Sequence, residues 1–467
     1  MFLTFVRDLY CTYKIIKIKK NHIPLQLKGV LIRLIDKQTK EYGITIMKKL
    51  LKYLVVSILS IVGLLGISVL LSVTVFKDAL IEFLMKSQQE EMKSYYISEL
   101  PVEPDLFAED FKSIHDQVVE ECSLCKQKGY DMDSLYTTFS NRIGSEVQTK
   151  EDYGIMLNEY FAALKIGHAW PFFRGHAAQY HPTIAEDRIF ISNPSEHLLH
   201  CGFCDKDEII AINNVPIGQY VENKKRCTFA STEEYRLRKA QLGIFTSPTD
   251  TLITCSVRRN GEVLSLDLPL SCTMPIEESQ AYHRIINDSV GYIYLESMMH
   301  TVVEDFKRAY EQVRHLPYLI VDNRYNSGGS SNNGRKIAEY LLCKKQKHCV
   351  SGNITPQPNA YTGKLFLLTS NKTISAAESF TLDLKESGLA TLVGERTAGD
   401  TGCGPKVFTS KYGICFYIPT REAGVSPKGF PMEGTCIEPH HEVKQTIADF
   451  LDDKDTIIEY VLNELIG

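Results

Sequence analysis

The stretch Leu319-Ile-Val-Asp-Asn-Arg-Tyr-Asn-Ser-Gly-Gly329 decides the fold class of this 467-residue chain. It begins inside an apolar run, Tyr318–Asp322, that is typical of a buried strand, and it continues into a polar loop with two glycines. A helical pattern follows at Arg335 to Leu342. A buried strand that leads through a loop into a helix predicts an α/β layer with mainly parallel pairing. In such sheets the catalytic groups lie at the carboxyl ends of the strands.

The same alternation of strands and helices continues on both sides of this stretch. Further segments with a strand or helix pattern are Val290–Leu295, Val302–Val313, Leu365–Thr369, Glu378–Glu386 and Thr391–Gly394. Short apolar runs predict the strands, and helical spacing of apolar residues predicts the helices. We therefore assign residues 282–467 to one α/β core.

Residues 181–272 have the pattern of a small β-rich module. Residues Leu252–Leu268 contain two alternating strands that meet at an Asn-Gly turn. The run Gly202–Ile217 resembles the PDZ pattern of a Gly-rich turn, an acidic pair and a strand that ends in a turn. A PDZ-like module implies that extended peptides bind by strand addition, whereas a purely structural β-domain is the alternative.

The residues before this module predict a helical subdomain and a membrane segment. Apolar residues recur at helical spacing across 106–119 and 153–164, which predicts a helical subdomain over residues 78–180. Tyr53–Phe76 contains no charged side chain and is long enough to cross a bilayer as a helix. We therefore predict a transmembrane signal-anchor over residues 47–77.

Charge around this segment predicts its orientation. Residues 1–46 carry nine Lys and Arg against three Asp and Glu, which places the N-terminus in the cytoplasm and residues 78–467 outside it, in a periplasm or at a cell surface. The leader 1–46 is either a cytoplasmic segment or a mis-assigned start before Met47. A cleaved signal peptide is the alternative to an anchor, and the protein is then secreted.

The composition argues against a disordered chain and against a nucleic-acid-binding protein. The chain is 44% apolar and 23% charged, an ordinary globular mixture, and its net charge of −5 gives no reason to expect a nucleic-acid partner. Of the 13 cysteines, Cys11 lies in the leader, and the other twelve permit disulfides or buried free thiols in an exported domain. Cys122-x-x-Cys125 and Cys201-x-x-Cys204 have the spacing of zinc half-sites, but they lie far apart in the sequence. We predict no metal and no cofactor.

Two short motifs carry the candidate chemistry. Ser375 follows a buried strand and begins a helix, which places its hydroxyl at the sheet edge beside backbone N–H groups suited to a developing oxyanion. The alternative is an N-cap serine whose capping box is closed by Glu378. The glycine pair Gly328-Gly329 lets the backbone approach a ligand closely, although a plain turn has the same sequence.

Three segments together resemble the tail-specific, or C-terminal processing, serine peptidases. They are Leu319–Gly329, Ser375-Ala-Ala-Glu378 and Gly394-Glu-Arg-Thr-Ala-Gly399, in the family's order and approximate spacing. The resemblance implies a ClpP/crotonase-like catalytic core with Ser375 as nucleophile. One position departs from the lysine-dependent members, because Asp400 stands where they carry the catalytic lysine. An aspartate cannot act as the neutral amine base.

The histidine-containing tricorn-core branch of the same superfamily is the better match. Leu164-Lys-Ile-Gly-His168-Ala-Trp170 resembles its histidine segment, and Pro431–Pro439 resembles its glutamate segment with Glu433 at the matching position. The resemblance implies that His168 is the general base and that Glu433 supports the site. The branch has a serine before its histidine, where this chain has Gly167.

These observations predict a serine endopeptidase that cleaves unfolded or tail-exposed proteins outside the cytoplasmic membrane. Histidine accepts a proton near neutral pH, and the backbone N–H groups of Ala376 and of Gly328 or Gly329 are expected to hold the oxyanion. Protein or peptide substrates are the expected partners. The alternative is a catalytically inactive protein that binds peptides or apolar ligands on the same scaffold.

Overall fold

The computed structural model describes residues 93–271, 281–299 and 301–467. The predicted anchor over 47–77 and the leader 1–46 lie outside the described residues. No helix among the residues that are described is both long enough and apolar enough to cross a membrane.

The core sheet has the strand order β12-β13-β14-β17-β18-β21. These strands are β12 Ala281–Asn287, β13 Val290–Leu295, β14 Tyr318–Asp322, β17 Lys364–Thr369, β18 Ala390–Gly394 and β21 His441–Glu442. Strand β12 pairs antiparallel with β13, and every other neighbouring pair in the sheet is parallel. The prediction of an α/β layer with mainly parallel pairing is confirmed.

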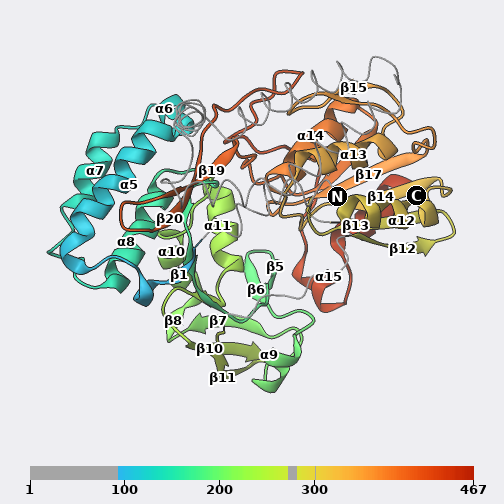
Figure 1. Cartoon of the computed structure of the whole chain (residues 1–467). Coiled ribbons are helices and arrows are strands. Elements are labelled where there is room, and N and C mark those ends of the chain that lie inside the picture. Colours follow the sequence, from blue (N-terminus) through green and yellow to red (C-terminus); the bar gives the residue numbers. More distant parts are fainter. Residues whose placement is uncertain (1–92, 272–280, 300) are drawn as a thin grey trace, which may run out of the picture. The chain divides into compact units, whose positions relative to one another are not determined.

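Helices cover both faces of this sheet, which explains the unbroken apolar runs of its strands. The covering helices are α12 Val302–Val313, α13 Ser331–Leu341, α14 Ala376–Ser387 and α16 Thr456–Tyr460. On one face Leu319 and Val321 share a core with Phe306 of α12. On the other face Ile320 shares a core with Ile457 of α16. Figure 1 shows α12, α13 and α14 beside these strands.

A helical layer forms a second core. Its main helices are α5 Phe107–Glu121, α7 Met132–Ser140 and α8 Lys150–Ala163, drawn in blue to cyan in Figure 1. Residues from the C-terminal third of the chain complete this core, because Phe416 and Ile418 of β20 are buried in it. The sheet β19-β20-β2 brings them there, with β19 Pro405–Thr409, β20 Cys415–Pro419 and β2 Trp170–Pro171. The predicted helical subdomain and the predicted core thus share a sheet.

The third core belongs to the β-rich module. Its sheet has the order β11-β10-β7-β6-β5, and β8 pairs with β7. The elements are β5 Thr183–Ala185, β6 Arg188–Phe190, α9 Glu196–His200, β7 Glu208–Ile212, β8 Val215–Pro216, α10 Ile217–Lys225, α11 Glu233–Leu242, β10 Leu252–Arg259 and β11 Glu262–Pro269. Strands β10 and β11 pair antiparallel around Asn260-Gly261, as the Asn-Gly turn predicts. The PDZ-like assignment stays a prediction.

Short elements connect these three cores. They are β1 Tyr95–Tyr96, η1 Ile97–Glu99, η2 Pro104–Leu106, α6 Ser123–Lys128, β3 Phe173–Arg174, β4 His176–Ala177, β9 Thr246–Ser247, β15 Gln346–Lys347, β16 Asn353–Ile354, α15 Ile447–Leu451 and η3 Val461–Ile466. The segment between α8 and β2 and the segment before α11 both reach the carboxyl end of the core sheet, where the candidate site lies.

Candidate active site

Ser375 lies at a strained turn between β17 and α14. It is the N-cap of α14, with φ 56° and ψ −124°, a conformation that is unfavourable for serine. Its side chain makes no capping hydrogen bond. Glu378 instead accepts hydrogen bonds from Thr397 Oγ1 and from the backbone N–H groups of Gly399 and Asp400. The capping-box interpretation is therefore wrong, and a strained turn of this kind exposes a serine hydroxyl.

The glycine pair lies against this turn. A Cβ atom on Gly328 would come within 2.7 Å of the Ser375 Cβ, so only glycine fits there. The Gly328 N–H donates to Asn326 Oδ1 at 2.9 Å. Among the described residues, the N–H groups of Gly329 and Ala376 have no hydrogen-bond acceptor. These two groups are the donors left for an oxyanion.

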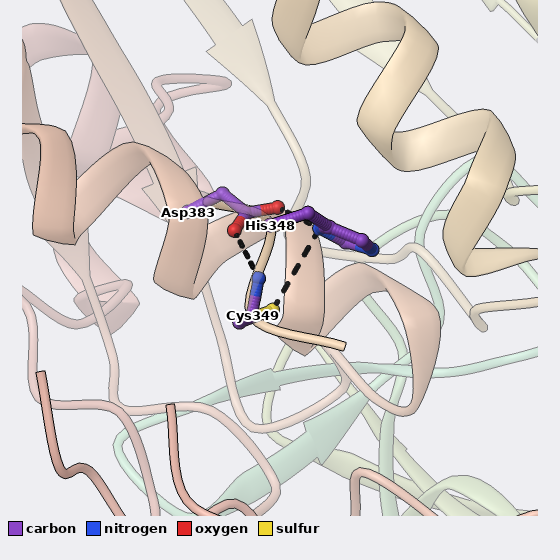
Figure 2. Close-up of side chains that lie close together, drawn as sticks. All are labelled: His348, Cys349 and Asp383. Carbon is purple, nitrogen blue, oxygen red and sulfur yellow. Dashed lines mark hydrogen bonds and ion pairs between the residues drawn. The ribbon is translucent and has the colours of Figure 1, made fainter. Parts of the chain in front are cut away.

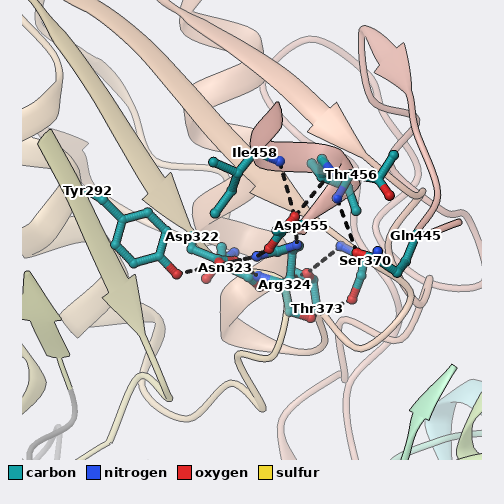
Figure 3. A network of polar contacts seen from close by, with 11 residues as sticks. Tyr292, Asp322, Asn323, Arg324, Ser370, Thr373, Gln445, Asp455, Thr456 and Ile458 are labelled. Carbon is teal, nitrogen blue, oxygen red and sulfur yellow. Dashed lines mark hydrogen bonds and ion pairs between the residues drawn. The ribbon is translucent and has the colours of Figure 1, made fainter. Parts of the chain in front are cut away.

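A buried ion network holds the loop that carries the glycine pair (Figure 3). Arg324 turns back onto Asp322 at the end of β14, with Nη2 2.7 Å from Oδ2, and it also binds Asp455 at 2.7 Å. Tyr292 donates its hydroxyl to Asp322 at 2.7 Å. Bidentate arginine–carboxylate pairs of this kind fix geometry as well as charge. The network explains the Asp-x-Arg spacing of the segment and anchors residues 323–329.

His168 joins the nucleophile to a buried carboxylate. It lies between α8 and β2, and its Nε2 is 3.2 Å from Ser375 Oγ. Its Nδ1 is 2.8 Å from Asp400 Oδ1. An N–H on Nδ1 that donates to the carboxylate leaves Nε2 as an acceptor for the serine hydroxyl. Ser375, His168 and Asp400 thus form an unbroken hydrogen-bonded chain.

Asp400 is the functional residue that sequence reasoning missed. Its side chain is 2% exposed, and its carbonyl accepts a hydrogen bond from the Ser375 N–H at 2.9 Å. A Cβ atom on Gly167 would lie 1.4 Å from Asp400 Oδ2, so the carboxylate occupies the space that a side chain at 167 would fill. Asp400 in place of the family's lysine and Gly167 in place of its serine are therefore complementary changes. Their joint occurrence in one sequence is the signal from which the role of Asp400 could have been predicted.

Glu433 forms a backbone bridge with Asp400, and the two side chains are linked through one hydroxyl. Ser231, in the segment before α11, donates to Glu433 Oε1 and lies 3.2 Å from Asp400 Oδ1. The Gly167 N–H donates to the same hydroxyl at 3.0 Å. The other Glu433 oxygen accepts from the Gly402 N–H at 3.1 Å. The structure brings Ser375 and His168 together, and it places Glu433 behind Asp400.

Burial and charge set the proton affinities of the site. Burial lowers the pKa of His168, but the charge and hydrogen bond of Asp400 outweigh burial and raise that pKa above its usual 6.5. Burial raises the pKa of Asp400, and the neighbouring His168 reverses the shift, so the pKa lies below its ordinary value. Burial and the charge of Asp400 raise the pKa of Glu433. Of the two carboxyls, the one in direct contact with His168 is thus the one whose pKa is lowered.

A separate cluster carries the residue types of a metal site. His348, Cys349 and Asp383 place one donor atom each within 4.8 Å of one another, and all three side chains are buried (Figure 2). His348 Nδ1 is already bound to Asp383 at 2.6 Å. Within residues 93–271, 281–299 and 301–467, neither Cys-x-x-Cys pair has a third donor at such range.

The sequence matches two peptidase family models. Residues 289–443 match "Peptidase family S41", and residues 184–270 match "Bacteroidetes, Peptidase, S41 family, N-terminal domain". The first region contains strands β13 to β21 of the core sheet, Ser375 and Asp400. The second covers the β-rich module.

Curated relatives and solved structures agree with these matches. The chain is 29% identical over 196 residues to the tricorn protease of Thermoplasma acidophilum, covering 41% of this chain and 18% of that protein. It is 25% identical over 248 residues to chloroplastic carboxyl-terminal-processing peptidase 1 of Arabidopsis thaliana, covering 50% of this chain and 47% of that one. Mature CPAF complexed with lactacystin shares the fold, with a TM-score of 0.64 at 14% identity over 78% of this chain and 98% of that chain.

Proposed function

We propose that this chain, which belongs to the tail-specific protease superfamily, is a serine endopeptidase that hydrolyses protein or peptide substrates. Ser375 is the nucleophile, His168 the general base, and Asp400 the carboxylate that orients His168. The observation that carries the proposal is the hydrogen-bonded chain from Ser375 Oγ through both ring nitrogens of His168 to Asp400. The same constellation of serine, histidine and aspartate recurs on unrelated folds and is recognised by its geometry.

The reaction proceeds in two stages. Ser375 Oγ attacks the substrate carbonyl carbon while its proton passes to His168 Nε2, and the resulting imidazolium is stabilised by Asp400. The tetrahedral intermediate collapses when Nε2 returns the proton to the leaving amine, which leaves an acyl group on Ser375. Water then repeats the sequence and releases the acid. Proton transfer by a placed base contributes about 10²–10⁴ in rate.

Gly329 and Ala376 are the proposed oxyanion donors. Sequence reasoning offered Gly328 as well, but its N–H donates to Asn326 Oδ1. Its role in the proposal is to let the loop pass close to Ser375. One oxyanion donor is worth roughly 3 kcal/mol of transition-state stabilisation.

Glu433 is proposed as a positioning residue rather than a catalytic one. Its carboxylate contacts Asp400 through the Ser231 hydroxyl, and burial together with the charge of Asp400 raises the pKa of its carboxyl. The inactive binding protein considered above was motivated by the absent lysine and by Gly167. The triad geometry accounts for both positions, because Asp400 takes the space that Gly167 leaves.

The place of action is part of the same proposal. The apolar segment Tyr53–Phe76, preceded by basic residues, supports an anchor that leaves residues 78–467 outside the cytoplasmic membrane. Proteins with exposed or unfolded segments are the proposed substrates. The β-rich module is proposed to present such segments to the site.

The full chain, purified in detergent, tests the proposal with a fluorophosphonate probe and fluorescent casein. We expect the probe to label Ser375 in the wild type, and we expect Ser375→Ala to lose both labelling and casein cleavage with an unchanged circular dichroism spectrum. Ser379→Ala, one turn further along α14, is the matched control and keeps both. Absence of labelling in the wild type, or turnover that survives in Ser375→Ala, would reject the assignment.

A further inference from the structure

Two cysteine sulfurs meet inside the helical layer. Cys122 ends α5 and is the N-cap of α6, and Cys125 lies in the first turn of α6. The Cys125 thiol donates to Cys122 Sγ with the two sulfurs 2.8 Å apart, and the Cys125 N–H points at the same sulfur at 3.4 Å. Both side chains are almost fully buried in the apolar core of the helical layer.

We infer that Cys122 and Cys125 are an oxidisable dithiol that closes to an intramolecular disulfide. The sulfurs lie between a bonded distance of about 2.0 Å and an ordinary contact, so the two side chains already face each other at close to bonding range. A metal site is the other use of Cys-x-x-Cys spacing. It needs further ligands, and the described residues supply none within reach of this pair.

The step is a thiol–disulfide exchange with a small disulfide such as oxidised glutathione. Both sulfurs are buried, so the exchange requires the start of α6 to open locally. In the open form the Cys122 thiolate attacks one sulfur of the oxidant, forms a mixed disulfide and releases one reduced thiol. The Cys125 thiolate then attacks Cys122 Sγ and releases the second. Two protons leave the protein, and the oxidant takes up two electrons. The hydrogen bond from Cys125 lowers the pKa of Cys122, and the same contact together with burial raises the pKa of Cys125, so Cys122 is the first nucleophile.

The location of the pair connects it to the segment that carries the general base. On α6, Gln127 exchanges hydrogen bonds with the backbone of Ala423. The Lys128 ammonium donates to the Lys165 carbonyl at 2.7 Å, three residues before His168. A disulfide at the start of α6 therefore fixes the helix that supports this segment. It acts on the stability of the helical layer and leaves the triad atoms in place.

The second Cys-x-x-Cys pair is a control that the chain provides. Cys201 is half-buried and Cys204 is exposed, and no contact between their sulfurs occurs in the described structure. The two pairs have the same sequence spacing, and they differ in whether the sulfurs face each other. Each pair falls within a single tryptic peptide, residues 113–126 and residues 189–206 respectively.

The test equilibrates the full chain, in detergent, in glutathione buffers of defined potential, followed by acid quenching, alkylation and peptide mass spectrometry. We expect peptide 113–126 to appear unalkylated and two hydrogens lighter than its dithiol form. Its ratio of disulfide to dithiol should exceed that of peptide 189–206 by at least about tenfold, which equals about 30 mV. Complete alkylation of Cys122 and Cys125 while peptide 189–206 is oxidised overturns the inference, and so do equal ratios.

A second measurement does not depend on any catalytic assay. Thermal unfolding of the wild type is expected to shift to higher temperature after oxidation and to return on reduction. Cys125→Ser should abolish the shift, whereas the double substitution Cys201→Ser and Cys204→Ser should keep it. A shift that persists in folded Cys125→Ser contradicts the inference, and the wild-type mass measurement decides the case if that variant does not fold.

Discussion

Two histidine–carboxylate pairs flank helix α14, and only one of them is arranged for catalysis. His168 binds Asp400 through Nδ1 at 2.8 Å, and His348 binds Asp383 through Nδ1 at 2.6 Å. Each pair also has a hydroxyl or thiol nearby, Ser375 in the first case and Cys349 in the second. By residue type alone, each cluster contains a nucleophile, a histidine base and an acidic residue.

The difference lies in which nitrogen faces the nucleophile. Ser375 Oγ lies on the free Nε2 of His168, whereas Cys349 Sγ is 4.0 Å from the same Nδ1 that already holds the carboxylate of Asp383 (Figure 2). Among the described residues, no group hydrogen-bonds to Nε2 of His348. Burial also raises the pKa of the Cys349 thiol, which is 7% exposed. The second cluster therefore lacks both a proton path and access for a substrate.

The second pair has a structural task instead. Asp383 accepts hydrogen bonds from His348 and from the Cys349 N–H, and its carbonyl accepts one from Gln346. These contacts fix the segment of β15 and β16 onto α14, the helix whose N-cap is Ser375. The comparison teaches that orientation and access, rather than a set of residue types, define a catalytic group.

Substituting the two histidines should give the largest contrast. His168→Ala removes the proposed general base of Ser375, so we expect kcat/KM on a casein-derived peptide to fall by about 10⁴-fold. His348→Ala should leave activity per folded molecule within about twofold of wild type, while Tm falls because a buried pair loses one partner. Initial rates and thermal unfolding measure both. A His348→Ala variant that is inactive at an unchanged Tm would break the comparison.

Substituting Asp400 and Asp383 should give a difference in activity almost as large as that between the two histidine variants. Asp400→Asn keeps the size of the side chain but favours the wrong tautomer of His168, and we expect kcat to fall by about 10³–10⁴-fold with little change in KM. Asp383→Asn is the matched control, and its expected effect is on Tm. Steady-state kinetics distinguishes them. Equal losses of kcat in the two variants would mean that Asp400 acts only on the fold.

Gly167 tests whether Asp400 needs the space it occupies. The Cβ of Gly167→Ala would overlap Asp400 Oδ2, and displacement of the carboxylate should lower kcat/KM by about 10²-fold. In an Asp400→Ala background the same substitution should cost less than about threefold, because the overlapping atoms are gone. The double-mutant cycle measures the coupling, and additive losses would refute the complementarity of the two positions.

Glu433 should matter less than Asp400. Glu433→Gln keeps the contact with the Ser231 hydroxyl and leaves Asp400 in place, so we expect about a tenfold loss in kcat/KM, equal to about 1.4 kcal/mol. The measurement is the ratio of the Glu433→Gln and Asp400→Asn losses under one set of conditions. A ratio near one would mean that Glu433 supports His168 as strongly as Asp400 does, which contradicts the expected order.

The smallest expected effect is a shift of the pH profile of kcat/KM between the wild type and Asp400→Asn. Catalysis needs neutral His168, so activity falls as pH drops through the His168 pKa, and the midpoint of this acid limb should lie above 6.5. Asp400→Asn removes the largest influence that raises the His168 pKa. Burial and the Lys239 charge still lower that pKa and the Glu433 charge still raises it, so the midpoint should move to lower pH. The charged pair also stabilises the fold below the unfolded pKa of His168, and this contribution is lost as pH rises through the folded pKa. Profiles of kcat/KM in both proteins measure the shift, and coincident midpoints would contradict it.

Local pattern was enough to predict the scaffold. The apolar runs at Tyr318–Asp322 and Leu365–Thr369 are β14 and part of β17, and the amphipathic segment Val302–Val313 is α12. Motif resemblance located Ser375 and His168, which the structure brings within 3.2 Å of each other. Each of these inferences rests on residues that are close together in the chain.

The site features that the sequence did not predict depend on residues that are far apart in the chain. Asp400 lies 232 positions from His168, and its identity as the orienting carboxylate appears only when the two segments meet. Ser231 carries no motif at all. The capping box failed because tertiary contacts impose a positive φ on Ser375, which turns its hydroxyl away from the helix N-terminus and toward His168. The preference of serine for the N-cap conformation is overridden here by the tertiary contacts that hold the strained turn.

The distance along the chain between the triad members has a consequence for when activity begins. A ribosome releases His168 first, Ser375 207 positions later, and Asp400 after that. A nascent, stalled or truncated chain that ends before residue 400 holds a base without its nucleophile or without its orienting acid. Under the proposed mechanism, hydrolysis is therefore postponed until residue 400 has been made and has folded against His168.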